Sequence, residues 1–300
     1  MRASLLAVPA LLLVAVPATA QRSLEGVEIK VEQVAPGVAV LFGAGGNIGL
    51  SHGADGNILI DDQFAPLTEK IAAAVATLDP DPVRFVINTH WHGDHTGGNE
   101  NFAERGAVVV AHDNVRRRMS TEQLREVGQA PTPPSPEGAL PVVTFDDGVT
   151  FHLNGDTIRA VHVAHAHTDG DALVYWTDAN VLHMGDTFFN GMLPFIDLAS
   201  GGSIDGAIRA VEKALAMTNE KSVIIPGHGP IAARADLVRY RDMLATLRTD
   251  IAARIAAGHT LDEIKADRLA DAYGKPDDFI SPDEFIEAVY ESLTAEPHGH

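Results

Sequence analysis

Three histidines and one aspartate fall within six consecutive positions of the sequence HWHGDH. An apolar run at 83–87 precedes them and predicts a buried strand, and the glycines that follow predict a turn. On an extended backbone His90 and His92 point the same way, because side chains alternate with period two, whereas Asp94 and His95 come from the bend. A polar surface loop would rarely gather four such groups by chance. The cluster therefore predicts a site for two metal ions at the end of a strand.

Three more ligand candidates come later in the chain, and each follows a strand-like apolar run: His167, Asp186 and His228. Taken singly, each is explained as well by an ordinary buried histidine or a turn aspartate. Taken together and in order, they favour one shared rim with the first cluster. His165 competes with His167 for the same place in the sequence HAHTDGD.

These motifs, in this order, resemble the metallo-β-lactamase superfamily over roughly residues 30–235. The resemblance implies an α/β fold, a four-layer αββα sandwich of two mixed β-sheets with helices on the outside. Periodicity alone predicts only a mixture of strands and helices. The His-Thr pair followed by acidic and glycine residues matches the third motif of the family, which favours His167 over His165.

The resemblance also implies how the candidates divide between two ions, for which zinc is preferred although other divalent metals suit the same ligands. The first ion would be held by His90, His92 and His167. The second would be held by Asp94, His95 and His228. Asp186 would bridge the ions or complete the second site, and Asp61 would brace the metal loop from outside. A metal-bound hydroxide would attack a carbonyl, and Asp94 would orient it as the catalytic residue.

Two positions depart from the cysteine-using β-lactamases of this family. Asp186 stands where those enzymes have a thiolate, and Phe189 stands where they have a lysine that holds the substrate. Three functions stay open. A β-lactamase-like hydrolase with weak or promiscuous activity comes first, a thioester or lactone hydrolase of the glyoxalase II type second, and a metal-binding protein without turnover third.

Residues 1–20 predict a secretory signal peptide, because Arg2 precedes a short apolar run that ends at a small-residue cleavage site. We therefore expect a periplasmic or secreted protein with no membrane anchor after cleavage, a hydrolase domain at 21–258 and a helical extension at 259–300. The formal net charge of −19 argues against nucleic acid and favours a small-molecule substrate. The oligomeric state stays open. The chain has no cysteine, which excludes a thiolate ligand.

Overall fold

A computed structural model describes residues 24–123 and 131–295. The predicted signal peptide at 1–20 lies outside these residues. The sequence also predicts a helix at 115–127, and positions 124–127 lie outside the described residues. Among the described helices none has the length and apolar character needed to cross a bilayer.

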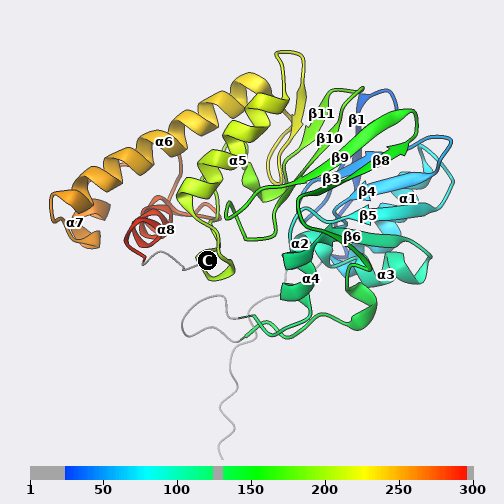
Figure 1. Ribbon diagram of the computed structural model, residues 1–300, viewed down its shortest axis with the longest axis horizontal. Helices are drawn as coiled ribbons and strands as arrows, with labels where there is room; N and C mark the ends of the chain where they lie inside the picture. Colours follow the sequence, from blue (N-terminus) through cyan, green and yellow to red (C-terminus); the bar gives the residue numbers. More distant parts are fainter. Residues whose placement is uncertain (1–23, 124–130, 296–300) are drawn as a thin grey trace, which may run out of the picture.

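The strands form two mixed sheets (Figure 1). The first sheet has the order β1-β2-β3-β4-β5-β6-β7, antiparallel up to β4 and parallel from there. Its strands are β1 (Lys30–Ala35), β2 (Val38–Phe42), β3 (Ile48–Ser51), β4 (Asn57–Ile60), β5 (Val83–Ile87), β6 (Val108–His112) and β7 (Val143–Phe145). The second sheet has the order β13-β12-β11-β10-β9-β8, with only β11 and β12 parallel. Its strands are β8 (Gly148–Leu153), β9 (Asp156–His162), β10 (Ala172–Trp176), β11 (Val181–His183), β12 (Val223–Ile225) and β13 (Ala232–Ala233).

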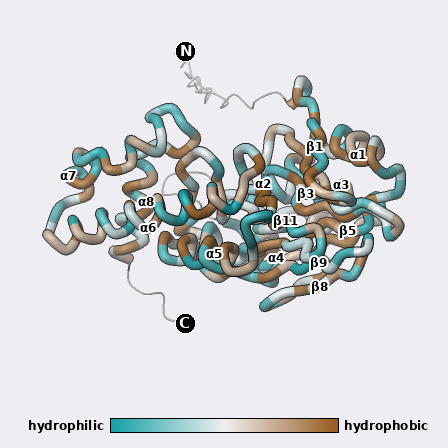
Figure 2. Tube along the Cα trace, turned by 90° about the horizontal axis from the view of Figure 1, so that it is seen from above, coloured by the Kyte–Doolittle hydropathy of each residue, from teal (hydrophilic) through white to brown (hydrophobic). Residues whose placement is uncertain are grey.

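Helices cover the outer face of each sheet, which confirms the predicted αββα sandwich. The helices are α1 (Thr68–Ala76), α2 (Gly93–Thr96), α3 (Asn99–Glu104), α4 (Asp113–Met119), α5 (Ile204–Met217), α6 (Arg234–Ala256), α7 (Leu261–Ala266) and α8 (Pro282–Thr294). In Figure 2, α6, α7 and α8 lie on the side opposite to α1 and α3, and α2 lies between the two groups.

Successive side chains of the central strand β4 point to opposite faces of its sheet and pack in different layers. Ile58 and Ile60 face the second sheet and join a buried inter-sheet cluster with Val174 and Trp176. Leu59, between them, faces the other way and packs with Leu67 and residues of α1. Because both faces of the strand are covered, all its positions are apolar except Asn57 at the start.

The segment at 259–300 packs on the sandwich within its described part. Phe285, Ile286 and Val289 of α8 are fully buried in the same cluster as α5 and α6. Ser281 and Glu284 cap α8 reciprocally, since the hydroxyl accepts from one backbone N–H and the carboxylate accepts from the other. The proposed division at 258 therefore does not separate two hydrophobic cores.

Three local expectations differ from the structure. The strand-like run at 142–145 predicts the first strand of a second half of the fold, but β7 pairs with β6 and closes the first sheet. An apolar run predicts a strand and does not specify its partner. The apolar spacing at 65–78 predicts one helix, but the segment forms a 3-10 turn, η1 (Ala65–Leu67), followed by α1, which begins at Thr68. The helix predicted at 115–127 begins earlier and is shorter within the described residues, since α4 runs from Asp113 to Met119.

Two histidines join the sheets at one edge of the inter-sheet space. The rings of His112, at the end of β6, and His162, at the end of β9, stack 3.8 Å apart and 10° from parallel. Burial, and then the neighbouring His162, lowers the pKa of His112 to about 4. Burial also lowers the pKa of His162. Both rings are therefore neutral at neutral pH.

This pair predicts a pH-dependent stability. A histidine whose folded pKa lies below its unfolded value binds its proton more tightly in the unfolded chain, so its stabilising effect is complete above pH 6.5 and is lost as the pH falls toward 4. In His112→Asn the capping acceptor for Asn114 N–H is kept. Between pH 7 and 5 we expect the wild type to lose about 1–2 kcal/mol more unfolding free energy than this variant, measured by urea titration with a chelator present. Equal losses would contradict the prediction.

Candidate metal centre

The seven predicted ligands come from four connections at one end of the sandwich. The segment after β5 and the start of α2 carry His90, His92, Asp94 and His95. The other three follow β9, β11 and β12: His167 in the β9–β10 loop, Asp186 in the 3-10 turn η3 (Gly185–Thr187), and His228 after β12. The structure thus brings together side chains up to 138 positions apart, as their shared place at strand ends predicts.

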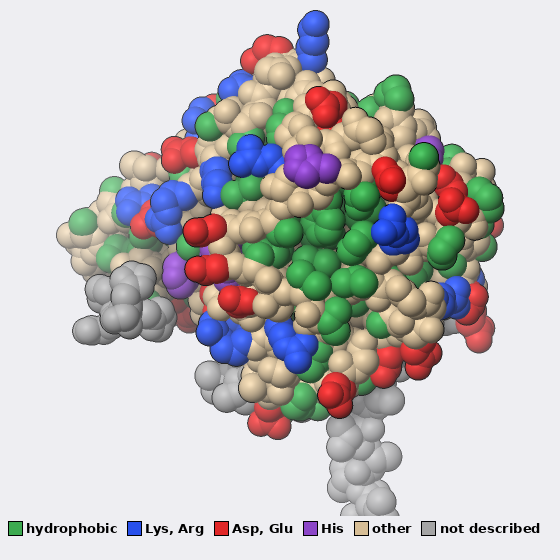
Figure 3. Space-filling view, turned by 45° about the vertical axis from the view of Figure 1, so that its right-hand side comes forward, with side chains coloured by type: hydrophobic (Ala, Val, Ile, Leu, Met, Phe, Trp, Pro, Cys, Tyr) green, Lys and Arg blue, Asp and Glu red, His purple; other side chains and the backbone are tan. Residues whose placement is uncertain are grey.

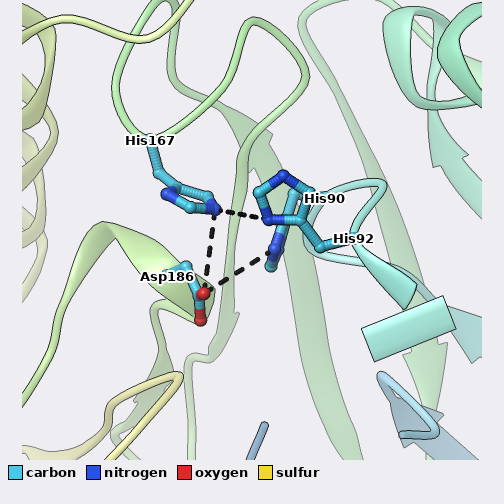
Figure 4. Close-up of side chains that lie close together, drawn as sticks. All are labelled: His90, His92, His167 and Asp186. Atoms are coloured by element: carbon cyan, nitrogen blue, oxygen red, sulfur yellow. Dashed lines mark hydrogen bonds and ion pairs between the residues drawn. The ribbon is translucent and has the colours of Figure 1, made fainter. Parts of the chain in front are cut away.

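Four of these side chains form a compact buried group (Figure 4). His90, His92, His167 and Asp186 each direct one ligand atom toward the others, and these atoms all lie within 4.8 Å of one another. His167 Nε2 lies 2.9 Å from His92 Nδ1 and 3.7 Å from Asp186 Oδ2. His90 Nε2 lies 3.8 Å from the same oxygen.

A second group lies beside the first and includes Asp94, His95 and His228, again within 4.8 Å of one another. Asp186 belongs to the first group but also reaches the second, since its Oδ1 lies 3.1 Å from His95 Nε2 and its Oδ2 lies 3.4 Å from His228 Nε2. This position between the groups is the one that a bridging carboxylate would need. The side chains of Asp94 and His228 are 28% and 25% exposed, so the opening to solvent lies on their side.

The donor set fits divalent cations. His90 Nε2 is buried and has no hydrogen-bond partner among the described residues, which is costly for a polar atom unless it binds something else. Burial, and then His95, lowers the pKa of His90 well below its usual value, so this ring is neutral and can donate a lone pair. Burial raises the pKa of Asp94, but His95 and His228 outweigh it and lower the pKa to about 2. Ionised carboxylates and neutral imidazoles are zinc ligands.

Asp61 makes three buried hydrogen bonds to the metal loop. Its Oδ1 accepts from Thr89 N at 2.7 Å, and its Oδ2 accepts from Thr89 Oγ1 at 2.7 Å and from His95 Nδ1 at 2.8 Å. Because the hydroxyl hydrogen is directed to the carboxylate, Thr89 Oγ1 accepts from His90 Nδ1 at 3.0 Å. The outer nitrogens of both rings thus carry protons, and each ring directs its Nε2 atom toward the ligand groups. These contacts support the predicted bracing role of Asp61.

Two contacts that sequence reasoning missed hold the other rings. Asp197 Oδ2 accepts from His92 Nε2 at 2.9 Å and from Ser200 Oγ at 2.6 Å. The backbone oxygen of Phe195 accepts from His167 Nδ1 at 2.8 Å, so the proton of that ring lies on Nδ1 and its Nε2 is bare. No sequence pattern indicates that residues 195 and 197 would meet ligands from other motifs.

We expect Asp197→Asn to weaken metal binding. The carboxylate of Asp197 can only accept a hydrogen bond, so it keeps the proton of the His92 ring on Nε2 and leaves Nδ1 bare for a metal. An amide can turn its NH₂ group toward His92 Nε2 and no longer favours this tautomer. The loss should be about 10- to 100-fold in zinc affinity. Competition against a chromophoric chelator measures it. Asp205→Asn is a matched control, because this carboxylate pairs with Arg248 of α6 and contacts no predicted ligand. Unchanged affinity in Asp197→Asn would contradict the prediction.

The glycine-rich turn between β2 and β3 packs on the metal loop. Gly46 N donates to Asp94 O at 3.1 Å, and a Cβ on Gly46 would lie 2.0 Å from the ring of His95. Only glycine allows this approach. The turn therefore supports the ligand loop from one side.

The competing histidine lies outside both groups. His165 is exposed, and its Nδ1 donates to Gly201 O at 2.9 Å. His183 also lies outside both groups. It is fully buried, and its Nε2 donates to Asn47 O at 2.9 Å.

Comparison with known proteins agrees with this geometry. Residues 42–228 match the profile of the metallo-beta-lactamase superfamily, which is more than half of the chain. The chain belongs to the metallo-beta-lactamase superfamily. Members of this superfamily are mostly metal-dependent hydrolases. Together with the two His/Asp groups, membership indicates a divalent metal site, for which zinc is preferred.

Two of the curated proteins that resemble this chain are named as hydroxyacylglutathione hydrolases. The one from Gloeobacter violaceus is 23% identical over 234 residues, 71% of this chain and 79% of its own length. The one from Methylococcus capsulatus is 32% identical over 147 residues, 44% of this chain and half of its own length. Among solved structures, a metallo-beta-lactamase from Pontibacter korlensis has a TM-score of 0.60 at 20% identity, covering 73% of this chain and 99% of its own. That likeness concerns the fold.

Proposed function

We propose that this protein is a hydrolase that uses two divalent metal ions, preferably zinc, to cleave an activated carbonyl compound. The observation that carries the proposal is the pair of adjacent groups joined by Asp186, each made of histidine and carboxylate ligands. Bound metal would polarise the carbonyl and acidify a water molecule. The chain offers the arrangement that this chemistry needs, with buried ligands on one side and a solvent opening on the other.

The residues of the centre would divide the remaining tasks. Asp94 is ionised at neutral pH and lies at the opening, so its carboxylate can orient the attacking water by accepting a hydrogen bond from it. Phe189 is buried and stacks on the ring of His228, with centroids 5.2 Å apart, so it fixes the plane of that ring. Asp61, Thr89 and Asp197 hold the other rings in place.

Within this class we place thioester or lactone hydrolysis ahead of β-lactam hydrolysis. Phe189 offers no positive charge to a substrate carboxylate, and two curated relatives are named as hydroxyacylglutathione hydrolases. Weak β-lactamase activity is the second candidate. It is favoured by the exposure of Asp94 and His228, which leaves room for a bulky ring carbonyl to approach.

A substrate panel tests the proposal. The zinc content of the purified protein is measured by mass spectrometry, and hydrolysis is then followed for an acyl thioester, a lactone, a chromogenic cephalosporin and a phosphotriester. We expect two metal ions per chain and turnover of the thioester or lactone. Turnover of the cephalosporin alone would reverse the order of substrates. Metal binding without any turnover would reject the hydrolase and leave a metal-binding protein.

We also propose that the protein acts in the periplasm or outside the cell on a small molecule. The predicted signal at 1–20 supports this location, and the formal charge of −19 opposes binding to nucleic acid. On the face in Figure 3, Lys and Arg side chains lie scattered among acidic and apolar ones. Cell fractionation with intact-mass analysis should find a chain that starts at Gln21 in the exported fraction. A full-length chain in the cytosol would refute export.

A further inference from the structure

His228 belongs to a loop that has glycine on both sides of it, at positions 227 and 229. The loop follows β12, and Gly229 has a backbone φ of 96°. Glycine loses more conformational freedom on folding than any other residue, so such a loop needs contacts that hold it in one conformation. The ring of His228 stacks on Phe189, but its side chain is 25% exposed. The place of this ligand candidate therefore depends on how the backbone of residues 226–229 is held.

Asn47, the last residue of the turn between β2 and β3, holds this backbone from the side of the first sheet. Its side-chain amide donates to Pro226 O at 2.8 Å and to Gly229 O at 2.9 Å. Its backbone N donates to Gly227 O at 2.7 Å. Hydrogen bonds from one buried residue thus hold the loop both before and after His228. Both N–H groups of the amide are used by this loop.

The same turn contacts the other two members of the second group. Gly46 N donates to Asp94 O at 3.1 Å, and Gly46 lies so close to His95 that a Cβ would be 2.0 Å from its ring. The turn thus joins His95 to the loop of His228, 133 positions later in the sequence. The spacing of the ligand atoms in the second group therefore depends on this turn.

The backbone of Asn47 is also linked to the turn that carries Asp186. His183 Nε2 donates to Asn47 O at 2.9 Å, and His183 Nδ1 accepts from Gly185 N at 3.1 Å. This link uses the backbone oxygen of Asn47, which a substitution keeps. The side chain of Asn47 can therefore be changed without removing the link to Asp186, the candidate that reaches both groups.

We propose that Asn47 is a positioning residue that sets the affinity of the centre for its second metal ion, by holding His228 at binding distance from Asp94 and His95. The inference rests on the two-ion centre of the proposed function. His228 Nε2 lies 3.3 Å from Asp94 Oδ2 and 3.4 Å from His95 Nε2, so the three ligand candidates are already gathered. Ligands held in place before binding raise affinity, because binding then has less chain to order.

Asn47→Leu tests the inference, because it removes both amide donors without adding a charge and with little change in volume. Zinc is titrated into the metal-free full chain against a chromophoric chelator. We expect the affinity for the second ion to fall by about 10- to 100-fold and that for the first to change by less than about threefold. Amide hydrogen exchange of residues 227–229 in the metal-free chain should become faster. Excess zinc should restore kcat/KM, because every predicted ligand is still present.

Asn57→Leu is the matched control. Asn57 is also buried, and its amide also donates to two backbone oxygens, those of Asp79 at 3.3 Å and Asp81 at 2.6 Å. It stands at the start of β4, whereas Asp61 of the metal loop contacts follows the end of that strand. This variant should unfold at lower urea concentration than the wild type and keep both zinc affinities.

Asn47→Ala removes the same donors from a smaller side chain and should show the same selective loss, which keeps the test available if Asn47→Leu fails to fold. Unchanged affinities in the Asn47 variants, equal weakening of both ions, or the same selective loss in Asn57→Leu would overturn the inference and leave the proposed function intact. Binding of a single zinc ion by the wild type would overturn the two-ion centre and the inference with it.

Discussion

His92→Ala should lose one of two metal ions and nearly all hydrolytic activity while the fold stays intact. The imidazole of His92 is one of four ligand candidates in the first group. Its removal leaves only three side chains for the ion and weakens its binding. We expect kcat/KM to fall by about 10³-fold or more, because polarisation of the carbonyl and acidification of water both depend on the metal. Metal content by mass spectrometry and the thioester assay measure the two losses.

His165→Ala provides the matched control for this prediction. It removes the same chemical group from the third motif, two residues before His167, but His165 is exposed and outside both groups. Its metal content and kcat/KM should stay close to those of the wild type. Far-UV circular dichroism should give the same spectrum for both variants. Full activity in His92→Ala, or metal loss in His165→Ala, would refute the assignment of the first group.

The sequence predicts much of this architecture because the informative residues lie at the ends of regular elements. The short apolar run at 58–60, preceded by a glycine-containing turn, predicts a strand, and the residues that follow a strand lie at the edge of its sheet. His167, Asp186 and His228 could therefore be proposed as neighbours of the HWHGDH cluster without a three-dimensional structure. Their side-chain chemistry then limits the choice to a metal site.

The remaining contacts depend on tertiary packing that no local pattern encodes. Asp197 lies in an irregular segment 105 residues after His92, and its sequence neighbours indicate only a local turn with Ser200. The pairing of β7 with β6 is equally undetermined, since its short apolar run suits either sheet. The position of α8 over residues 194–199 depends on how α8 packs against α6 and α5. Helix periodicity predicts only that one face of α8 is buried.

Asp61→Ala should impair both stability and metal binding, although Asp61 is in neither ligand group. Its carboxylate is fully buried and accepts from Thr89 N, Thr89 Oγ1 and His95 Nδ1. Without it, three buried donors lose their acceptor, which should cost about 3–5 kcal/mol of unfolding free energy. The Thr89 hydroxyl would also be free to donate to His90 Nδ1, which moves the proton of that ring to Nε2 and opposes metal binding. We expect zinc affinity to fall by about 10- to 100-fold.

A control variant at the neighbouring Asp62 distinguishes the loss of any buried acidic side chain from the loss of the hydrogen bonds that Asp61 makes to the metal loop. Asp62 is also fully buried, but its side chain accepts from Gly98 N at 2.8 Å, and burial raises its pKa well above the usual value. Asp62→Asn should therefore change zinc affinity less than about threefold, because the side chain of Asp62 contacts no predicted ligand. Urea unfolding and chelator competition measure both variants. Asp61 has a backbone φ of 64°, a conformation that asparagine tolerates better than alanine does. Asp61→Asn therefore keeps the backbone unstrained but replaces one of the two carboxylate oxygens by an NH₂ group. Metal loss shared by Asp61→Asn and Asp61→Ala would arise from the missing acceptor oxygen rather than from backbone strain. Normal zinc affinity in Asp61→Asn would show that backbone placement, and not the direction of the ring protons, prepares His90 and His95 for the metal.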